Sequence, residues 1–351
     1  MTSNPQFDSN TTGTEVAAAL GGEIRGRNVV ITGVSPESIG ASTALAIASQ
    51  SPSTLVLASR TKSKVETVAK NIKAKYPTVT VKVVILDLSS IDSIKSAAAE
   101  INSTLDRIDI LINNAGVSQL TRDPVITPGD IKVDLQFFTN HLGPFLFTEL
   151  LLPGLLKAGS QAGKGEPRIV NLSSHGHRLS PIRFSDYAFE RELYDGVPEE
   201  ERPPTTVAPG FLQIRNGYAG FIGYGQSKTA NVLHSVELTR RLQSKGANVM
   251  ALAVHPGSIE TGLNRNLDDK GKETLGGTAP GGVWKSIDEG AATTLVAAFD
   301  PKLVEIESRG YWYLADCQLA DQRLADHARD PKAAERLWAE TEKMLGITSI
   351  I

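Results

Sequence analysis

Short apolar runs that are rich in β-branched residues alternate with longer helical segments along most of the chain. Most of the short runs are apolar at nearly every position, which is typical of strands buried on both faces of a parallel sheet. Strands that alternate with helices predict a single doubly wound α/β (Rossmann) domain, with a parallel sheet of about seven strands and helices on both faces. The predicted strands are 28–32, 54–58, 79–86, 108–112, 168–172, 248–254 and a weaker candidate at 310–314, and the clearest helices are 41–50, 61–76 and 91–105.

The two ends of the chain lie outside this alternation. Residues 1–26 are polar and Gly-rich, which predicts a frayed, flexible arm with one short helix near 15–20. The alternation fills residues 27–315, so this span is the predicted main domain. In the tail, 316–351, the sequence predicts a surface helix at 330–346 that has a proline in its first turn.

Two long irregular segments interrupt the main domain. Residues 175–222 contain a Pro-rich, acidic stretch, and residues 264–282 are polar and Gly-rich, which predicts a second mobile loop. A loop as long as the first inside a compact domain is usually functional or disordered. Its aromatic side chains could line a lid over a ligand or could pack the insertion onto the domain, and we favour the lid. These aromatic residues are Phe184, Tyr187, Phe189, Tyr194 and Phe211.

Composition and charge narrow the classes of function. The chain has 351 residues, of which 40% are hydrophobic and 21% charged, and its net charge is −3. This balance is that of an ordinary globular protein, and it provides no long-range attraction to nucleic acid or to an anionic membrane. The single cysteine, Cys317, cannot form a disulfide within the chain or supply a multi-cysteine metal site, which favours a reducing compartment.

Targeting signals are not evident in the sequence. The most apolar long stretch, 145–156, contains a glutamate, a proline and a glycine and is too short for a transmembrane helix. The polar amino terminus lacks the basic and apolar regions of a secretory signal, and the last three residues do not match the peroxisomal tripeptide. The predicted location is therefore cytoplasmic.

A small, turn-rich loop, ITGVSPESIGAS, follows the first predicted strand and opens a helix. Such a loop directs backbone N–H groups and the helix dipole at a pyrophosphate. Its position after the first strand of an α/β sheet strengthens the prediction of a dinucleotide site. The residues expected to contribute are Thr32, Gly33, Ser38, Ile39 and Gly40.

The ends of the second and third strands bear on the choice of cofactor. Arg60 stands where an NAD enzyme usually has an acidic residue, and an arginine there can instead accommodate the 2′-phosphate of NADP. We therefore predict NADP(H), although Arg60 could also be a solvated side chain beside Lys62 and Lys64. Asp87 could accept a hydrogen bond from an adenine amino group or cap the next helix.

The fourth strand runs directly into Asn113, Asn114, Ala115 and Gly116. The small residues allow a close approach of the backbone, and the asparagine amides can bond to neighbouring strands or to a cofactor. We expect Asn114, Ala115 and Gly116 to contact the cofactor.

Tyr224 and Lys228 lie four residues apart at the start of a predicted amphipathic helix, so their side chains project from one face, one turn apart. A free phenol titrates near pH ~10 and is a poor proton shuttle at neutral pH. A nearby ammonium favours the phenolate and should lower the pKa of Tyr224 toward the useful range. The alternative is a chance Tyr-x-x-x-Lys pair on a surface helix.

Other polar residues follow the fifth and sixth strands at the same edge of the sheet. Ser173 and Ser174 end the fifth strand, and a hydroxyl there can donate a hydrogen bond to a substrate carbonyl. Pro256, Gly257 and Thr261 lie in the loop after the sixth strand. Because the carboxyl ends of parallel strands bind ligands in α/β sheets, we expect these loops to converge.

With these five ordered motifs the chain resembles the short-chain dehydrogenase/reductases over about residues 25–315. The branch that it resembles most is the retinol-dehydrogenase-like and WW-domain-oxidoreductase-like branch that is widespread in fungi. The resemblance implies that Tyr224 is the general acid/base and that Lys228 lowers its pKa and holds the nicotinamide ribose. It also implies that Ser174, rather than Ser173, orients the carbonyl and that Asn140 anchors a water in a proton relay to Lys228. By the same resemblance Pro256, Gly257 and Thr261 belong to a Pro-Gly motif near the carboxamide and phosphates.

Two features depart from the family pattern. One residue is inserted in the glycine loop, and Ser38 stands where the middle glycine would fall, where it could cap the helix. The interval between Ser174 and Tyr224 is longer than usual, and the excess is the segment 175–222, which we expect to lie over the substrate.

Two pairs of side chains favour structural interpretations over functional ones. His175 and His177 could be metal ligands, but no neighbouring Asp, Glu or Cys completes a site, so we interpret them as polar loop residues and predict no metal. Trp284 and Trp312 are predicted to belong to the core.

The resemblance implies a cytoplasmic NADP(H)-dependent oxidoreductase that interconverts an alcohol and a ketone or aldehyde. An aromatic-lined lid would suit a lipophilic small molecule, and similar fungal proteins often serve secondary metabolism. Neither nucleic acid nor a membrane is an expected partner, and family members often form homodimers through the helices that bear Asn140 and Tyr224. An alternative is a catalytically silent NADP-binding regulatory protein, favoured only by the altered glycine loop.

Overall fold

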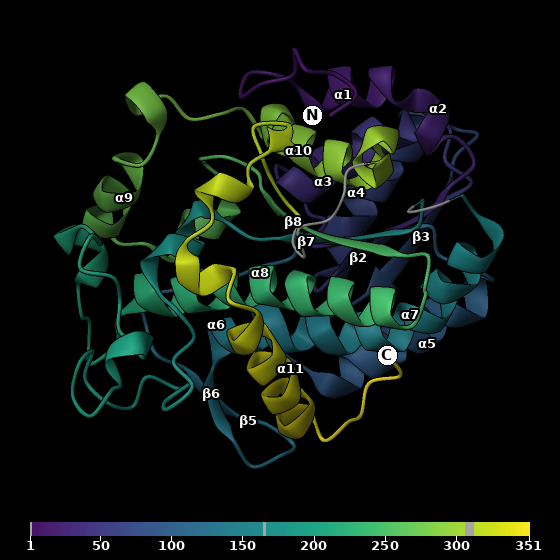
Figure 1. Ribbon diagram of the computed structural model, residues 1–351. Coiled ribbons are helices and arrows are strands. Elements are labelled where there is room, and N and C mark those ends of the chain that lie inside the picture. Colours follow the sequence, from purple (N-terminus) through teal and green to yellow (C-terminus); the bar gives the residue numbers. More distant parts are fainter. Residues whose placement is uncertain (1, 164–165, 306–311) are drawn as a thin grey trace.

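An eight-stranded sheet forms the centre of the computed structural model, which describes residues 2–163, 166–305 and 312–351 (Figure 1). The strands are arranged in the order β10-β9-β8-β7-β4-β1-β2-β3, and all neighbours are parallel except β9 and β10. The strand bounds are β1 Asn28–Thr32, β2 Thr54–Ser59, β3 Thr80–Ile85, β4 Ile110–Asn113, β7 Arg168–Leu172, β8 Met250–His255, β9 Tyr313–Ala315 and β10 Gln318–Leu319.

The doubly wound α/β fold predicted from the sequence is thus confirmed, with a parallel sheet of seven strands extended by the two-residue antiparallel strand β10. Strand order reverses between β1 and β4, and this switch point opens a crevice at the carboxyl ends of the strands. Part of the weak candidate at 310–314 lies outside the described residues, and the described remainder lies in β9. A separate two-stranded hairpin, β5 Pro124–Ile126 and β6 Lys132–Asp134, lies apart from the main sheet.

Helices cover both faces of the sheet, because its central strands are buried on both sides (Figure 1). One face packs against helices α3, α4 and α10, and the other packs against α5, α7, α8 and α11. The bounds are α3 Ile39–Ala48, α4 Lys62–Lys75, α5 Ile91–Thr104, α7 Gly143–Gln161, α8 Gly220–Ser244, α10 Ile287–Phe299 and α11 Pro331–Leu345. Shorter α-helices include α1 Gly13–Ala19, α2 Gly21–Ile24, α6 Leu135–Phe137 and α9 Asp269–Gly276.

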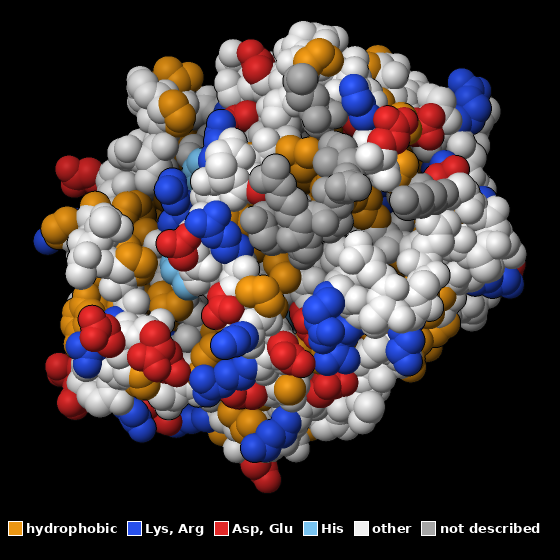
Figure 2. All heavy atoms as spheres, viewed as in Figure 1, with side chains coloured by type: hydrophobic (Ala, Val, Ile, Leu, Met, Phe, Trp, Pro, Cys, Tyr) orange, Lys and Arg blue, Asp and Glu red, His pale blue; other side chains and the backbone are white. Residues whose placement is uncertain are grey.

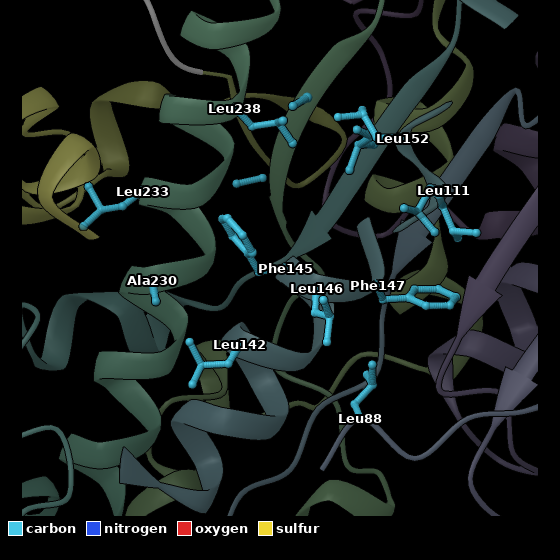
Figure 3. Packing of buried hydrophobic residues seen from close by; sticks show 14 of the residues in the cluster. Leu88, Leu111, Leu142, Phe145, Leu146, Phe147, Leu152, Ala230, Leu233 and Leu238 are labelled. Atoms are coloured by element: carbon cyan, nitrogen blue, oxygen red, sulfur yellow. The ribbon is translucent and has the colours of Figure 1, made fainter. Parts of the chain in front are cut away.

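The apolar core on the α7 and α8 face supports the helix that carries Tyr224. Phe145 from α7, Leu233 from α8 and Leu111 from β4 are fully buried members of this cluster (Figure 3). Helix α8 was predicted to be amphipathic, but most of its residues are buried, because α11 and the segment after β7 cover the side that faces away from the sheet. The first turns of α8 are consequently held both by the core beneath them and by the segments that cover the helix.

The amino-terminal segment is docked on the domain, which corrects the prediction of a frayed arm. Helix α1, Gly13–Ala19, begins with a capping box formed by Thr12 and Glu15. Its buried side chains, including Val16, pack against α10, and Leu20 joins the same cluster. The prediction was wrong because it judged the segment on its polar composition, whereas a few apolar side chains at helical spacing are sufficient for docking.

The predicted carboxyl-terminal helix is present as α11, with Pro331 at its first position and Gly346 in the left-handed conformation at its end. One face of α11 is buried against α8, with Trp338 in contact with Phe145 and His234. The chain's own tail therefore covers part of the helix surface on which the resemblance places a homodimer.

The surface charge on the viewed face and the hydrophobicity of the helices bear on where the protein could work. In Figure 2, Lys and Arg side chains are interspersed with Asp and Glu side chains, so this face carries mixed charge. In the part of the chain that the structure describes, none of the helices combines the length and the apolar character that a membrane crossing requires.

Candidate active site

The loop after β1 forms a tight cradle at the switch point of the sheet. Gly33 has φ +75°, and a Cβ added there would lie 2.6 Å from Ala115 Cα. A Cβ added at Gly40 would lie 2.6 Å from Asn114 Nδ2 and 2.7 Å from Gly33 O. Only glycine fits these two positions, because the loop after β1 and the loop after β4 contact each other through their backbones.

Ser38 caps helix α3, as the sequence suggested, since its hydroxyl accepts a hydrogen bond from Ala41 N. The residue inserted in this loop affects the backbone one position before Ser38. Glu37 has φ +55° and is exposed, so a non-glycine residue occupies the left-handed region beside the helix terminus. The amino terminus of α3 and Ile39 still open on the crevice, which preserves the place where a pyrophosphate would meet backbone N–H groups.

Thr32 and Asn114 hold the two loops together. The buried Thr32 hydroxyl accepts hydrogen bonds from Asn114 N and Ala115 N, both at 3.1 Å. The Asn114 amide donates to Thr32 O at 2.8 Å and more weakly to Gly33 O. The side chains of Thr32 and Asn114 therefore shape the cradle from within the protein.

Arg60 and Asp87 lie at the carboxyl ends of β2 and β3. Arg60 is exposed, and it forms no hydrogen bond or ion pair with the residues that the structure describes, so its guanidinium is available to a ligand. Asp87 accepts hydrogen bonds from the backbone N–H and the hydroxyl of Ser89. Asp87 thus stabilises the turn before α5, whereas the cap of that helix, considered for Asp87 from the sequence, is Ser90.

Tyr224 and Lys228 lie one turn apart near the start of α8. Lys228 Nζ lies 5.6 Å from the centre of the Tyr224 ring and donates a hydrogen bond to Leu172 O at 2.9 Å. Burial raises the pKa of Tyr224 to about 12, against a smaller lowering by the neighbouring Ser174 hydroxyl, and burial lowers the pKa of Lys228 to about 8.

The pKa of Tyr224 is thus shifted in the direction opposite to the one predicted from its lysine neighbour. The reason is that the Lys228 ammonium lies over the face of the ring and is bonded to a backbone carbonyl, while loss of solvent disfavours the phenolate.

The two serines after β7 point to different sides. Ser173 is buried and its hydroxyl donates to Lys228 O at 2.8 Å, which ties β7 to α8. The Ser174 hydroxyl accepts from Gly176 N and lies close to Tyr224. A Cβ added at Gly176 would lie 3.0 Å from Tyr224 Cε1 and 3.4 Å from Ser174 Oγ, so this glycine permits the close approach. The structure brings Ser174, and not Ser173, next to the phenol.

Asn140 lies on a single π-helical turn, Phe138–Leu142, directly before α7. Its amide oxygen accepts from Val117 N at 2.8 Å, and its amide nitrogen donates to Val117 O and to Ser227 Oγ. A Cβ added at Gly116 would lie 3.4 Å from both Asn140 Oδ1 and Lys228 Nζ. Gly116 therefore brings Asn140 and Lys228 to the same place.

A cavity of about 760 Å³ opens beside these residues, a size common for small-molecule sites. Tyr224 and Ser174 lie in its wall together with Pro256, Gly257 and Thr261, so the predicted loops do converge. About half of the other lining side chains are apolar. They include Leu179, Val207, Phe211, Phe221, Leu263, Leu275 and Trp284.

The aromatic lid is only partly as expected. Phe211 lines the cavity and packs edge-on against Phe221. Tyr187 and Phe189 are buried in the protein, and Phe184 lies under the guanidinium of Arg336. Tyr194 is exposed. Packing of the insertion, rather than lid formation, is therefore the role of Phe184, Tyr187 and Phe189, and only Phe211 faces the cavity.

Some residues of the cavity were missed or misassigned from the sequence. Trp284 lines the cavity instead of belonging to the core, while Trp312 is buried as predicted. His177 is fully buried, and the His175 ring stacks on that of His255 with centres 3.8 Å apart, so neither is an ordinary loop residue.

Residues 325–327 also contribute to the wall, although no sequence motif marks them. The predicted mobile loop at 264–282 contains helix α9, and its Leu275 and Thr278 face the cavity. Histidine side chains are visible in the hollow at the left of Figure 2. Among the described residues, no group of three or more His, Cys, Asp or Glu side chains could hold a metal ion.

The residues around the crevice fit a nicotinamide dinucleotide. The glycine cradle and the α3 amino terminus suit a pyrophosphate, and the unpaired Arg60 suits a terminal phosphate. Gly257, with φ +107°, keeps the loop after β8 close to Lys285 and leaves the space beside Tyr224 open. A proton donor, a hydroxyl and an ammonium thus surround one place where a carbonyl could bind.

Comparisons with known proteins agree with this geometry. A family model described as short chain dehydrogenase matches residues 27–188. Retinol dehydrogenase 13 of Homo sapiens is 35% identical over 92% of this chain and 86% of the relative. The oxidoreductase fscI of Fusarium equiseti is 35% identical over 72% of this chain and 94% of the relative.

Solved structures show the same fold. A protein from Mycobacterium paratuberculosis, 27% identical, superposes with a TM-score of 0.63 over 93% of this chain and 96% of that chain. RhlG of Pseudomonas aeruginosa, solved with NADP, is 20% identical and has a TM-score of 0.58 over 82% of this chain and 93% of that chain, a likeness that concerns the fold.

Proposed function

This chain belongs to the short-chain dehydrogenase/reductase family, and from that membership we propose that it is an NADP(H)-dependent enzyme that interconverts an alcohol and a ketone or aldehyde. Family membership makes it an oxidoreductase that acts on a small molecule. The apolar side chains in the cavity wall favour a lipophilic substrate. The observation that carries the proposal is the close approach of Ser174 and Tyr224, which Gly176 permits, at the wall of this cavity.

The glycine cradle at Gly33 and Gly40 and the amino terminus of α3 would hold the dinucleotide, and a nicotinamide bound there would provide the hydride chemistry for interconverting the carbonyl and the alcohol. Ser174 donates a hydrogen bond to the substrate oxygen and stabilises the charge that develops on it. Tyr224 transfers its phenolic proton to that oxygen during reduction. Because the pKa of Tyr224 is about 12, the phenol is protonated at neutral pH, which is the state that reduction requires.

Lys228 and Asn140 supply the remaining positioning. Lys228 can reprotonate the phenolate, since the pKa of its ammonium is lowered to about 8 by burial and lies below that of the phenol. Asn140, held by Val117 and Ser227, would anchor a water between Lys228 and solvent. This relay restores the proton that Tyr224 has given to the product.

The test of the proposal is hydride transfer by the purified chain. NADPH oxidation would be followed by absorbance with a panel of lipophilic aldehydes and ketones, including decanal, all-trans-retinal and a keto-steroid. The expected result is turnover of at least one class, abolished when Ser174 is replaced by alanine. Tight NADPH binding without turnover of any member would instead support the catalytically silent regulatory protein.

Replacing Arg60 by aspartate should weaken NADPH binding by about tenfold to hundredfold and should spare NADH, because a carboxylate repels the 2′-phosphate and can bond to a ribose hydroxyl. Fluorescence titration of both nucleotides measures the effect. Lys70→Asp is the matched control, since it makes the same change of charge at an exposed position of α4. It should leave the affinities for NADPH and NADH unchanged. Equal NADPH affinity in Arg60→Asp and the parent chain would overturn the assignment of NADP.

Three further expectations belong to the proposal. We propose a cytoplasmic location, since Cys317 has no second cysteine in the chain with which to form a disulfide. A place in secondary metabolism is proposed from the resemblance to fungal oxidoreductases. The homodimer stays a prediction, and α11 leaves less of α7 and α8 available for it.

A further inference from the structure

His177 is a buried histidine next to the proposed catalytic centre that the proposed mechanism does not use. It lies on the 3-10 helix η2, His175–Leu179, which follows Ser174 and packs against α8. Its side chain is fully buried, and burial lowers the pKa of the imidazole to about 3. His177 is therefore neutral at any pH at which the protein would work.

Both ring nitrogens of His177 have a partner, and the partners define the tautomer. Nδ1 lies 2.7 Å from Ser174 O, which can only accept, so Nδ1 carries the proton and donates. Nε2 lies 3.2 Å from Ala325 N and accepts its hydrogen bond. A single imidazole thus joins the backbone of Ser174 to a residue near the carboxyl terminus.

The backbone carbonyl of His177 extends this junction. It accepts hydrogen bonds from His327 Nε2 and from the hydroxyl of Thr229, each at 2.8 Å. Thr229 directly follows Lys228 in α8. His177 consequently contacts the end of β7, the catalytic helix and the carboxyl-terminal segment at once.

The segment held in this way forms one side of the substrate cavity. Ala325, Asp326 and His327, here called the C-terminal wall, all line it. In Figure 1 the yellow carboxyl-terminal segment passes in front of α8 before it enters α11. Two of its three residues are hydrogen-bonded to His177, one to the ring and one to the carbonyl.

We propose that His177 is a positioning residue that orients Ser174 through its Nδ1–H and fixes the C-terminal wall of the substrate cavity through its Nε2. The first contact restrains the peptide from which the Ser174 hydroxyl projects toward Tyr224. The second contact sets the distance between the wall and the reacting carbonyl. The inference rests on the proposed function for the role of Ser174, but its structural part can be tested without turnover.

Two isosteric substitutions separate the two contacts. In His177→Asn the side-chain amide N–H occupies the place of Nδ1–H, so the bond to Ser174 is kept and the bond to Ala325 is lost. In His177→Gln the side-chain oxygen occupies the place of Nε2, so the bond to Ala325 is kept and the bond to Ser174 is lost. Each variant therefore removes one of the two hydrogen bonds and keeps the other.

The first measurement is hydrogen–deuterium exchange of the peptide that contains Ala325, in the full-length protein. We expect exchange to accelerate about tenfold in His177→Asn, because one hydrogen bond is lost, and to change little in His177→Gln. Equal exchange in the two variants would overturn the inference, whether or not a substrate is known.

The second measurement is steady-state kinetics with decanal and NADPH, or with the most active member of the panel. His177→Asn should raise KM about tenfold at nearly unchanged kcat, and His177→Gln should lower kcat about tenfold at nearly unchanged KM. Equal effects of the two variants on both constants would mean that His177 is only a packing residue, and would overturn the inference.

His234→Gln is the matched control, because His234 is also buried and has a pKa of about 3 but lies on the α11 side of α8. His234→Gln should lower the stability of the protein, but it should not change one of the two constants, kcat or KM, while leaving the other unchanged. Ser174→Ala distinguishes the two levels of the argument. If Ser174→Ala keeps full turnover, the proposed role of Ser174 fails; if it loses turnover while His177→Gln does not, the positioning role of His177 alone fails.

Discussion

Tyr224→Phe should lower kcat for carbonyl reduction by about 10²–10⁴-fold, which is the range expected when a general acid is removed. The substitution deletes one oxygen atom and keeps the ring that packs against Gly176 and lies under Lys228 Nζ. The affinity for NADPH and the fold should therefore be preserved. Stopped-flow measurement of NADPH oxidation under single-turnover conditions would isolate the chemical step from product release.

The matched control for this prediction is Tyr218→Phe. Tyr218 lies just before α8, is fully buried, and its hydroxyl accepts a hydrogen bond from Gln136 Nε2 at 2.6 Å. Removal of that hydroxyl should cost about 1 kcal/mol of stability and leave kcat unchanged. Full turnover in Tyr224→Phe would show that another group supplies the proton, and it would refute the proposed mechanism.

The parallel strands were the most predictable part of the fold. The bounds of β1 and β7 match the sequence prediction, because strands buried on both faces produce uninterrupted apolar runs. Helix ends were less predictable, as in α3, which was predicted over 41–50 and spans Ile39–Ala48, although Ser38 had been recognised as a possible cap. The docking of α1 on α10 could not be inferred, since it depends on tertiary contacts of a few side chains in a polar segment.

The positions of the site residues followed from strand order, but their electrostatics did not. Alternation along an extended segment turns Ser173 toward α8 and Ser174 toward the cavity, so the choice between them is a matter of geometry. The raised pKa of Tyr224 depends on how deeply it is buried and on the carbonyl that Lys228 binds, which the sequence does not encode locally.

The C-terminal wall and Trp284 belong to irregular segments far along the chain from Ser174. No periodicity places such segments, so only their contacts, such as those of His177, bring them to the site.

Trp338→Ala should lower the free energy of unfolding by about 3–5 kcal/mol, the usual cost of truncating a large buried side chain. Trp338 is 1% exposed, its ring centre lies 4.7 Å from that of Phe145 and 5.7 Å from that of His234, and the guanidinium of Arg241 lies over it. The substitution would open a cavity between α11, α7 and α8. Urea unfolding followed by circular dichroism measures the loss.

Trp284→Ala is the matched control for Trp338→Ala, since both substitutions remove one indole. Trp284 is only partly buried and lines the substrate cavity, so its loss should change KM for a lipophilic carbonyl far more than the unfolding midpoint. Trp338 does not line that cavity, packs against His234 and Arg241 farther along α8, and should show the opposite balance. An unfolding midpoint that Trp338→Ala leaves unchanged would mean that α11 is not held against α8 in solution, and the covered helix surface would then be free for a second copy of the chain.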